Sequence, residues 1–175
     1  IVGSLPFAHY LAVARGGWRC LINDPQVRLF LLLVAGLIIL LSWYLTHSGQ
    51  AFGNAFRQSS FNAVSIMTGT GYVSANYSAW GGFASTVLLM VMFIGGCGGS
   101  TTCGIKVFRL QVLAATVRVQ ISRLLRPHAV VLAYYNRRPV NQEVMDSVMG
   151  FFYLYILGFV LIATLLGLMG LDFVT

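Results

Sequence analysis

The sequence Ser65-Ile-Met-Thr-Gly-Thr-Gly-Tyr72 decides the fold of this chain. Glycines alternate here with threonines, so that backbone carbonyls follow one another without large side chains between them. Such a row of carbonyl oxygens can replace the water shell of a dehydrated alkali cation. The stretch therefore predicts one strand of a potassium selectivity filter at residues 68–72.

The residues of this strand have different expected roles. The carbonyl oxygens of Thr68 through Gly71 would face the ion, and Gly71 would adopt a backbone conformation that is closed to residues with a side chain. Tyr72 would pack behind the loop and hold its width. A plain turn between two helices is the alternative for a Gly-Thr-Gly sequence. The neighbouring segments decide between the two interpretations.

The composition is that of an integral membrane protein. Hydrophobic residues make up 58% of the 175 residues and charged residues only 9%, with a mean hydropathy of +0.81, whereas soluble domains carry roughly 25% charged residues. The formal net charge is +7, but all of the basic residues except Arg57 gather in two segments that flank apolar spans, as the positive-inside rule describes. We therefore expect membrane lipid around the chain and no nucleic-acid partner. The two segments contain Arg15, Arg19 and Arg28, and Lys106, Arg109, Arg118, Arg123, Arg126, Arg137 and Arg138.

The apolar runs predict two full membrane spans with a hairpin between them. Residues 27–45 would cover about 28 Å as a helix, which is enough to cross the hydrocarbon core. Residues 54–67 would cover about 20 Å and are rich in polar side chains, so they predict a re-entrant pore helix that leads to the filter. Residues 148–171 form the second span, and both spans would run from the inside to the outside. Beyond the filter, Tyr77 and Trp80 are expected at the outer membrane interface.

A glycine-rich stretch interrupts the next apolar segment. Residues 82–125 predict one span that is broken at residues 95–104, because each glycine costs roughly 1 kcal/mol relative to alanine in a helix. The stretch nearly matches a phosphate-binding loop, but Ile105 displaces the lysine and no strand precedes it, which argues against that function. Two interpretations stay open: a small-residue surface for helix packing, or an irregular loop below the filter that obstructs the pore and must move. The loop residues are Gly95, Gly96, Gly98, Gly99, Ser100, Thr101, Thr102 and Gly104.

The flanking regions frame this central segment, residues 26–126. Residues 1–25 are expected to be the end of a preceding transmembrane helix and a cytoplasmic linker. Residues 127–175 are expected to be a cytoplasmic turn and a further helix, whose N-terminus Asn141 caps. Lys106 is either a charge of the inner pore or a side chain that extends to the membrane interface, and the second is favoured. Because the chain opens without methionine and stops just beyond an apolar run, we expect a fragment of a longer polypeptide.

The chemically reactive side chains predict neither an enzyme nor a metal-binding cluster. The cysteines are Cys20, Cys97 and Cys103, an odd number without metal-ligand spacing, and we expect free thiols. The four acidic residues are scattered, and no histidine has a carboxylate at a workable spacing.

Two motifs together resemble the Trk/Ktr/HKT superfamily of potassium transporters, and within it the bacterial Trk membrane subunits. They are Phe61-Asn-Ala-Val-Ser-Ile-Met-Thr-Gly-Thr-Gly-Tyr72 and Gly95-Gly-Cys-Gly-Gly-Ser-Thr-Thr-Cys-Gly-Ile-Lys-Val-Phe-Arg109. In that family one polypeptide carries four repeats of helix, pore loop and helix around a single pore. The resemblance implies an all-α integral membrane fold of the potassium-channel type, in which residues 26–126 form the third repeat and residues 127–175 contain the first helix of the fourth.

The resemblance also implies a function, potassium uptake by a multi-pass protein of the bacterial cytoplasmic (inner) membrane. By position, Gly71 matches the family's filter glycine, Gly69 and Thr70 the carbonyl donors before it, and residues 95–104 the intramembrane gating loop. Family loops often have glycine where this chain has Cys103.

Several properties of the complete protein follow from the same resemblance. The family implies further pore repeats in the same polypeptide, a homodimer, a cytosolic nucleotide-binding regulatory subunit, and potassium as the transported ion without an organic cofactor. Channel-like conduction, ion-coupled symport, sodium transport and a non-transporting membrane scaffold remain alternatives. Glycine instead of serine at Gly71 favours potassium over sodium.

Overall fold

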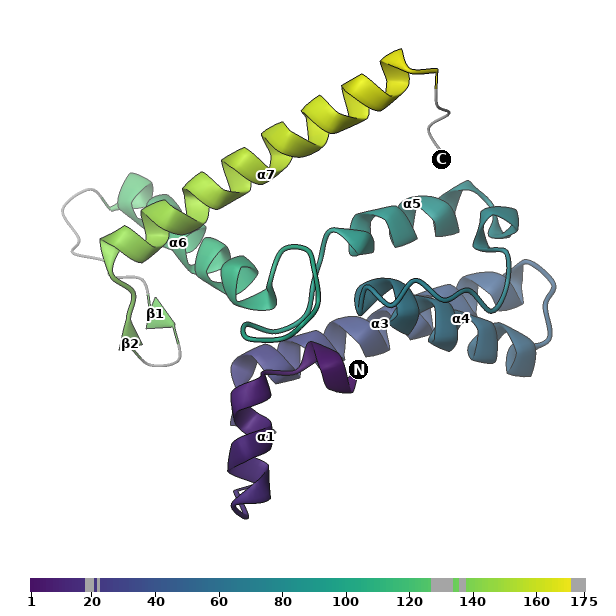
Figure 1. Cartoon of the computed structure of the whole chain (residues 1–175), viewed down its shortest axis with the longest axis horizontal. Coiled ribbons are helices and arrows are strands. Elements are labelled where there is room, and N and C mark those ends of the chain that lie inside the picture. The colour runs from purple at the N-terminus through teal and green to yellow at the C-terminus, as the bar shows by residue number, and fades with distance from the viewer. Residues whose placement is uncertain (18–20, 22, 127–133, 136–137, 171–175) are drawn as a thin grey trace. The chain divides into compact units, whose positions relative to one another are not determined.

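The computed structural model describes residues 1–17, 21, 23–126, 134–135 and 138–170 (Figure 1). The chain divides into two compact units, Ile1–Leu110 and Gln111–Thr175. Helices form nearly all of the regular structure, which confirms the all-α fold class. The first unit contains η1 (Val2–Ser4), α1 (Phe7–Ala14), α3 (Pro25–His47), α4 (Phe52–Met67), η2 (Tyr77–Trp80) and α5 (Gly82–Met92). The second contains most of α6 (Val107–Leu125), the two-residue strands β1 (Tyr134–Tyr135) and β2 (Arg138–Pro139), and α7 (Gln142–Leu168).

α3 has the start signal and the apolar character of a membrane-spanning helix. Asp24 caps its N-terminus, since a side-chain oxygen accepts a hydrogen bond from the Gln26 amide at 2.8 Å, and Pro25 lies in the first turn. Its 23 residues are long and apolar enough to cross a bilayer, and they include the span expected at 27–45. Buried side chains recur every three or four residues along the helix, as expected for one packed face. They are Val27, Phe30, Val34, Leu37, Leu41 and Leu45.

α4 packs against α3 and carries polar residues into the contact. Its 16 residues cover about 24 Å, less than the roughly 30 Å of a hydrocarbon core. The hydroxyls of Ser42 in α3 and Ser59 in α4 lie 2.6 Å apart, and Ser59 also donates to the Phe56 carbonyl at 3.1 Å. Ser42 therefore donates to Ser59, and both buried hydroxyls are satisfied inside an otherwise apolar contact.

The predicted break in the second helix of the hairpin is confirmed. α5 ends at Met92 and α6 begins at Val107, and residues 93–106 form an irregular loop between them. The two ends of the loop run side by side, because the Gly95 amide donates to the Ile105 carbonyl at 2.9 Å and the Ile105 amide donates to the Phe93 carbonyl at 2.9 Å. The chain thus leaves the helix axis and returns to nearly the same point.

The N-terminal segment differs from the single helix end expected for residues 1–13. Val2–Ser4 forms one turn of 3-10 helix, the backbone is extended at Leu5 and Pro6, and α1 begins only at Phe7. Proline lacks an amide hydrogen, so it precedes a helix more readily than it continues one. The extended backbone leaves peptide groups free to bond another segment.

Trp80 corrects another expectation from the sequence. Its side chain is only 7% exposed and belongs to the core of the first unit, and Tyr77 is half-buried against the same core. η2 packs on α5, so the chain beyond the filter loop folds back onto the hairpin. The prediction that Trp80 is an interfacial residue is therefore wrong in this chain.

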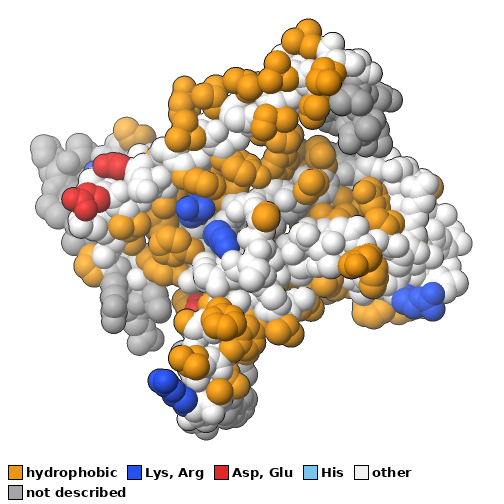
Figure 2. All heavy atoms as spheres, viewed as in Figure 1, with side chains coloured by type: hydrophobic (Ala, Val, Ile, Leu, Met, Phe, Trp, Pro, Cys, Tyr) orange, Lys and Arg blue, Asp and Glu red, His pale blue; other side chains and the backbone are white. Residues whose placement is uncertain are grey.

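The second unit has a small core and a long exposed helix. Val119 and Met145 are buried together, so α6 and the start of α7 are in contact. Asn141 caps α7 as predicted, because its side-chain oxygen accepts a hydrogen bond from the Gln142 amide. The apolar window of α7 that is long enough to span a membrane has none of its residues buried, and Figure 2 shows hydrophobic side chains along this helix. A surface of this kind requires lipid or other helices to cover it.

The close approach of the loop ends predicts that Gly95→Ala destabilises the fold. A Cβ atom at this position would lie 2.3 Å from the Cys103 carbonyl oxygen, a main-chain atom that cannot rotate away. We expect a loss of about 1–3 kcal/mol, measured as a lower midpoint of thermal unfolding in detergent. Gly36→Ala in α3 is the control, since nothing lies within 4 Å of its Cβ position. Equal midpoints for the two variants would contradict the packing described here.

Candidate functional site

The filter loop, residues 68–72, leaves the end of α4 through two glycines with positive φ. Gly69 has φ 66° and Gly71 has φ 78°, a region that residues with a side chain rarely adopt. The amides of Thr70 and Gly71 both point back to the Ser65 carbonyl, at 2.9 Å and 3.5 Å. The loop is therefore wound over the last turn of α4, and its amide groups turn toward that helix.

The carbonyl oxygens of the filter loop have no partner within the described chain. Among the residues that the structure describes, none donates a hydrogen bond to the carbonyls of Thr68, Gly69, Thr70 or Gly71. The Thr68 hydroxyl donates instead to the Val64 carbonyl at 2.8 Å, and the Thr70 hydroxyl lies 2.6 Å from that of Thr68. These contacts fix the side chains and leave the peptide oxygens available to a ligand.

Asn62 joins the pore helix to the chain just beyond the filter loop. Its side chain is 1% exposed. Its amide nitrogen donates to the Gln58 carbonyl at 2.9 Å and to the Ser74 hydroxyl at 3.2 Å, and its oxygen accepts from the Ser74 amide at 3.1 Å. Because both ends of the loop are now attached to α4, the loop cannot widen without breaking these bonds.

Tyr72 does not have the role expected from the sequence. Its side chain is 73% exposed and lines a groove of about 620 Å³ together with Phe61, Thr68 and Thr70. The prediction that it packs behind the loop is wrong for the described chain, since the Asn62 side chain, not the tyrosine, braces the loop from behind.

The glycine-rich loop, residues 95–104, is held together by its own hydroxyl groups. The Thr102 hydroxyl accepts a hydrogen bond from the Gly96 amide at 2.8 Å, and the Ser100 hydroxyl donates to the Cys97 carbonyl at 2.6 Å. Lys106 donates to the Ser100 carbonyl at 2.6 Å. The expectation that Lys106 extends to the membrane interface is therefore wrong, because its ammonium group satisfies a loop carbonyl.

The N-terminal segment is the second support of the glycine-rich loop. The Cys97 amide donates to the Ser4 carbonyl at 2.8 Å, and the Thr101 hydroxyl donates to the Gly3 carbonyl at 3.1 Å. In the other direction, the Phe7 amide donates to the Gly99 carbonyl at 3.2 Å. Sequence reasoning missed this contact, although the Gly3-Ser4 pair before Pro6 is the same kind of small-residue signal as the loop itself.

The free-thiol prediction holds for the described cysteines. Cys97 is buried and Cys103 is exposed, and both are unpaired thiols. Cys20 lies outside the described residues. No cluster of three or more His, Cys, Asp or Glu side chains that could hold a metal ion occurs in the part of the chain that the structure describes.

The buried Asn62 brace predicts that Asn62→Leu destabilises the filter loop. The substitution keeps the side-chain volume but removes the hydrogen bonds of Asn62 with the Ser74 amide, the Ser74 hydroxyl and the Gln58 carbonyl. Each is worth about 0.5–1.5 kcal/mol net, so we expect the free energy of unfolding in detergent to fall by about 1–3 kcal/mol. Asn54→Leu, an exposed position on the same helix, should cost much less. If the two variants are equally stable, Asn62 does not brace the loop.

Comparison with known proteins gives concordant matches. The family model of TrkH, a cation transport protein, matches residues 17–175. The Trk system potassium uptake protein TrkI of Halomonas elongata is 38% identical over 100% of this chain and 36% of its own length. TrkG of Escherichia coli K12, a Trk system potassium uptake protein, is 35% identical over 95% of this chain and 34% of its own length. This chain thus spans about a third of the curated relatives that it matches.

A solved structure agrees with these relatives. The crystal structure of the potassium transporter TrkH from Vibrio parahaemolyticus superposes with a TM-score of 0.89 at 33% identity, covering 98% of this chain and 38% of that protein. The resemblance noted from the filter and glycine-rich motifs is confirmed by these matches. Since the family model covers most of its length, the chain belongs to the TrkH family of cation transport proteins.

Proposed function

We propose that this chain forms one filter strand and the gating loop of a potassium uptake protein in the bacterial cytoplasmic membrane. The observation that carries the proposal is the row of carbonyl oxygens from Thr68 to Gly71, which accept no hydrogen bond from any described residue. The row follows a helix that is too short to cross the hydrocarbon core. The relatives named as potassium uptake proteins support potassium as the ion that these oxygens receive.

In the proposed mechanism a potassium ion exchanges its water oxygens for peptide oxygens. Gly69 and Thr70 supply the central oxygens from this strand. Their positions are set before the ion arrives, because the Ser65 carbonyl holds the amides of the loop and Asn62 holds its far end. Preorganisation of this kind reduces the ordering that binding would otherwise require.

The glycine-rich loop is the proposed gate. It is irregular backbone between two helices, and such backbone at membrane depth is tolerated where it lines a watery cavity or is buried in protein. Its contacts with Gly3 and Ser4 are three neutral hydrogen bonds, each worth about 0.5–1.5 kcal/mol net. The bond from the Lys106 ammonium is charge-assisted and worth about 1.5–3 kcal/mol. The closed position is therefore stable and can still be reversed by a modest conformational energy.

The complete protein needs further elements around this chain. The exposed apolar surface of α7 fits contact with further pore repeats of the same polypeptide and with lipid. A homodimer of the full polypeptide is part of the proposal on family grounds. Three exposed basic residues, Arg118 and Arg123 of α6 and Arg126 just beyond its end, fit a cytosolic nucleotide-binding regulatory subunit at the inner surface.

The filter proposal predicts that Gly71→Ser lowers the preference for potassium over sodium in the complete transporter. Serine is strained at φ 78°, at a cost of roughly 1–2 kcal/mol, so the neighbouring carbonyls must shift. We expect about a tenfold fall in the ratio of potassium to sodium uptake, because 1.4 kcal/mol corresponds to a factor of ten. The assay is ion uptake in cells that lack other potassium uptake systems.

The matched control is Gly53→Ser, a helical position on α4 where nothing lies within 4 Å of the Cβ site. It should retain the wild-type ratio. A folded Gly71→Ser protein with unchanged selectivity would count against the filter and favour a non-transporting scaffold or a different ion path.

The gate proposal predicts that removal of residues 98–102 raises potassium flux. The deletion removes Ser100, to which Lys106 is bound, and Thr101, which is bound to Gly3. We expect a severalfold higher maximal uptake rate with little change in the potassium concentration for half-maximal uptake, since the filter is untouched. A correctly folded deletion variant with the wild-type rate would refute the gating role.

A further inference from the structure

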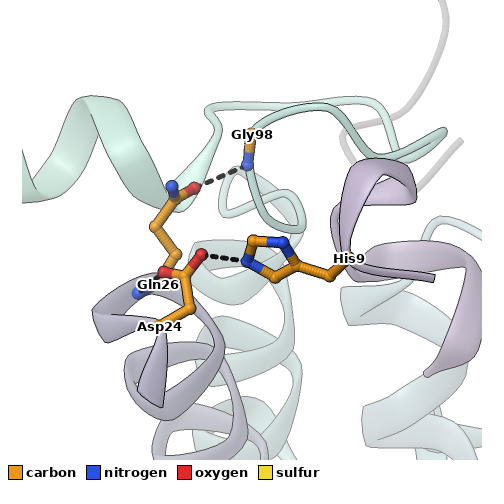
Figure 3. A network of polar contacts seen from close by, with 4 residues as sticks. All are labelled: His9, Asp24, Gln26 and Gly98. Atoms are coloured by element: carbon orange, nitrogen blue, oxygen red, sulfur yellow. Dashed lines mark hydrogen bonds and ion pairs between the residues drawn. The ribbon is translucent and has the colours of Figure 1, made fainter. Parts of the chain in front are cut away.

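Gln26, which the sequence analysis did not single out, contacts the glycine-rich loop directly. Its side-chain oxygen Oε1 accepts a hydrogen bond from the Gly98 amide at 2.8 Å, across 72 positions of sequence (Figure 3). The contact is close: a Cβ atom on Gly98 would lie 3.1 Å from this oxygen. The Gln26 side chain therefore lies directly against the tip of the loop.

The Gln26 side chain emerges from a firmly held turn. Asp24 accepts a hydrogen bond from the Gln26 amide with Oδ1, while its other oxygen, Oδ2, lies 2.5 Å from Nε2 of His9 in α1 (Figure 3). Pro25 restricts the backbone between them. Three segments, α1, the first turn of α3 and the glycine-rich loop, thus meet through the series His9, Asp24, Gln26 and Gly98.

The neutral oxygen of a glutamine side chain forms a hydrogen bond that is weak enough for the glycine-rich loop to leave it. It offers the Gly98 amide one neutral acceptor, and the net value of such a bond corresponds to about a three- to tenfold bias between two positions of the loop. A bond of this strength holds the loop in one position without preventing its release.

The geometry points to Gln26 as a positioning residue of the glycine-rich loop: its Oε1 holds the Gly98 amide and so keeps the loop in the closed position. This inference rests on the proposed function of the loop as a gate. Gln26, at the start of α3, thereby joins the residues that hold the loop, in addition to the hydroxyl groups of the loop itself.

The test compares Gln26→Met with Gln26→Glu in the complete transporter. Methionine has a similar length and lacks the acceptor oxygen, whereas glutamate keeps an oxygen that can accept from Gly98. We expect Gln26→Met to raise the maximal rate of potassium uptake about three- to tenfold, the bias expected for one hydrogen bond, with an unchanged KM. Gln26→Glu should not exceed the wild-type rate, because its carboxylate accepts a hydrogen bond at least as strong as that of glutamine. A Gln26→Met uptake rate equal to the wild-type rate would refute the claim that this bond keeps the gate closed.

A second readout follows the loop itself and does not depend on transport. Cys103 is exposed in the loop and Cys97 is buried. In a background where Cys20 and every cysteine outside this chain are replaced by serine, the rate of modification by a water-soluble maleimide therefore reports on Cys103. We expect Gln26→Met to raise this rate severalfold and Gln26→Glu not to raise it. A changed modification rate with unchanged uptake would support Gln26 as the positioning residue and refute the loop as the gate. An unchanged modification rate in a folded Gln26→Met protein would refute the role of Gln26.

Discussion

The unpaired carbonyl oxygens of residues 68–71 impose the constraint on which the rest of the structure depends. A peptide group without a partner in a membrane interior costs several kcal/mol, so a chain cannot place a row of them there without compensation. On the proposed function, the compensation is a cation that gains as many oxygens as it loses on leaving water. The short helix α4, the positive φ angles of Gly69 and Gly71 and the Asn62 brace fix the loop, whose carbonyl oxygens accept no hydrogen bond from the described residues.

The peptide groups of the second irregular segment also need hydrogen-bond partners. The glycine-rich loop also interrupts a helix, but its peptide groups are satisfied by Thr102, Lys106 and the backbone of the N-terminal segment. The two loops are therefore opposite in character. The loop of residues 68–71 leaves its carbonyl oxygens open to a ligand, whereas the glycine-rich loop is held by many individual hydrogen bonds. This difference is what a fixed filter and a movable gate require.

Local signals in the sequence were sufficient for the framework. The apolar run at 27–45 predicts α3, the polar residues of α4 mark a segment too short to span, and the glycines from Gly95 break the next helix. Each of these features depends on neighbours within a few positions, so composition and periodicity contain the information.

Side-chain partners distant in sequence were not predictable in the same way. Trp80 and Lys106 were assigned to the membrane interface because that is where such residues are common, but their environment is set by tertiary contacts. The Tyr72 side chain and the bond from Gly98 to Gln26 also depend on how segments far apart meet. A single sequence has no signal for such a pairing.

The most direct test of the filter is anomalous diffraction from crystals of the complete transporter grown with thallium or rubidium in place of potassium. The account predicts an ion peak at coordination distance from the carbonyl oxygens of Gly69 and Thr70. A filter without a peak, in which these oxygens accept hydrogen bonds from other parts of the protein, would contradict it.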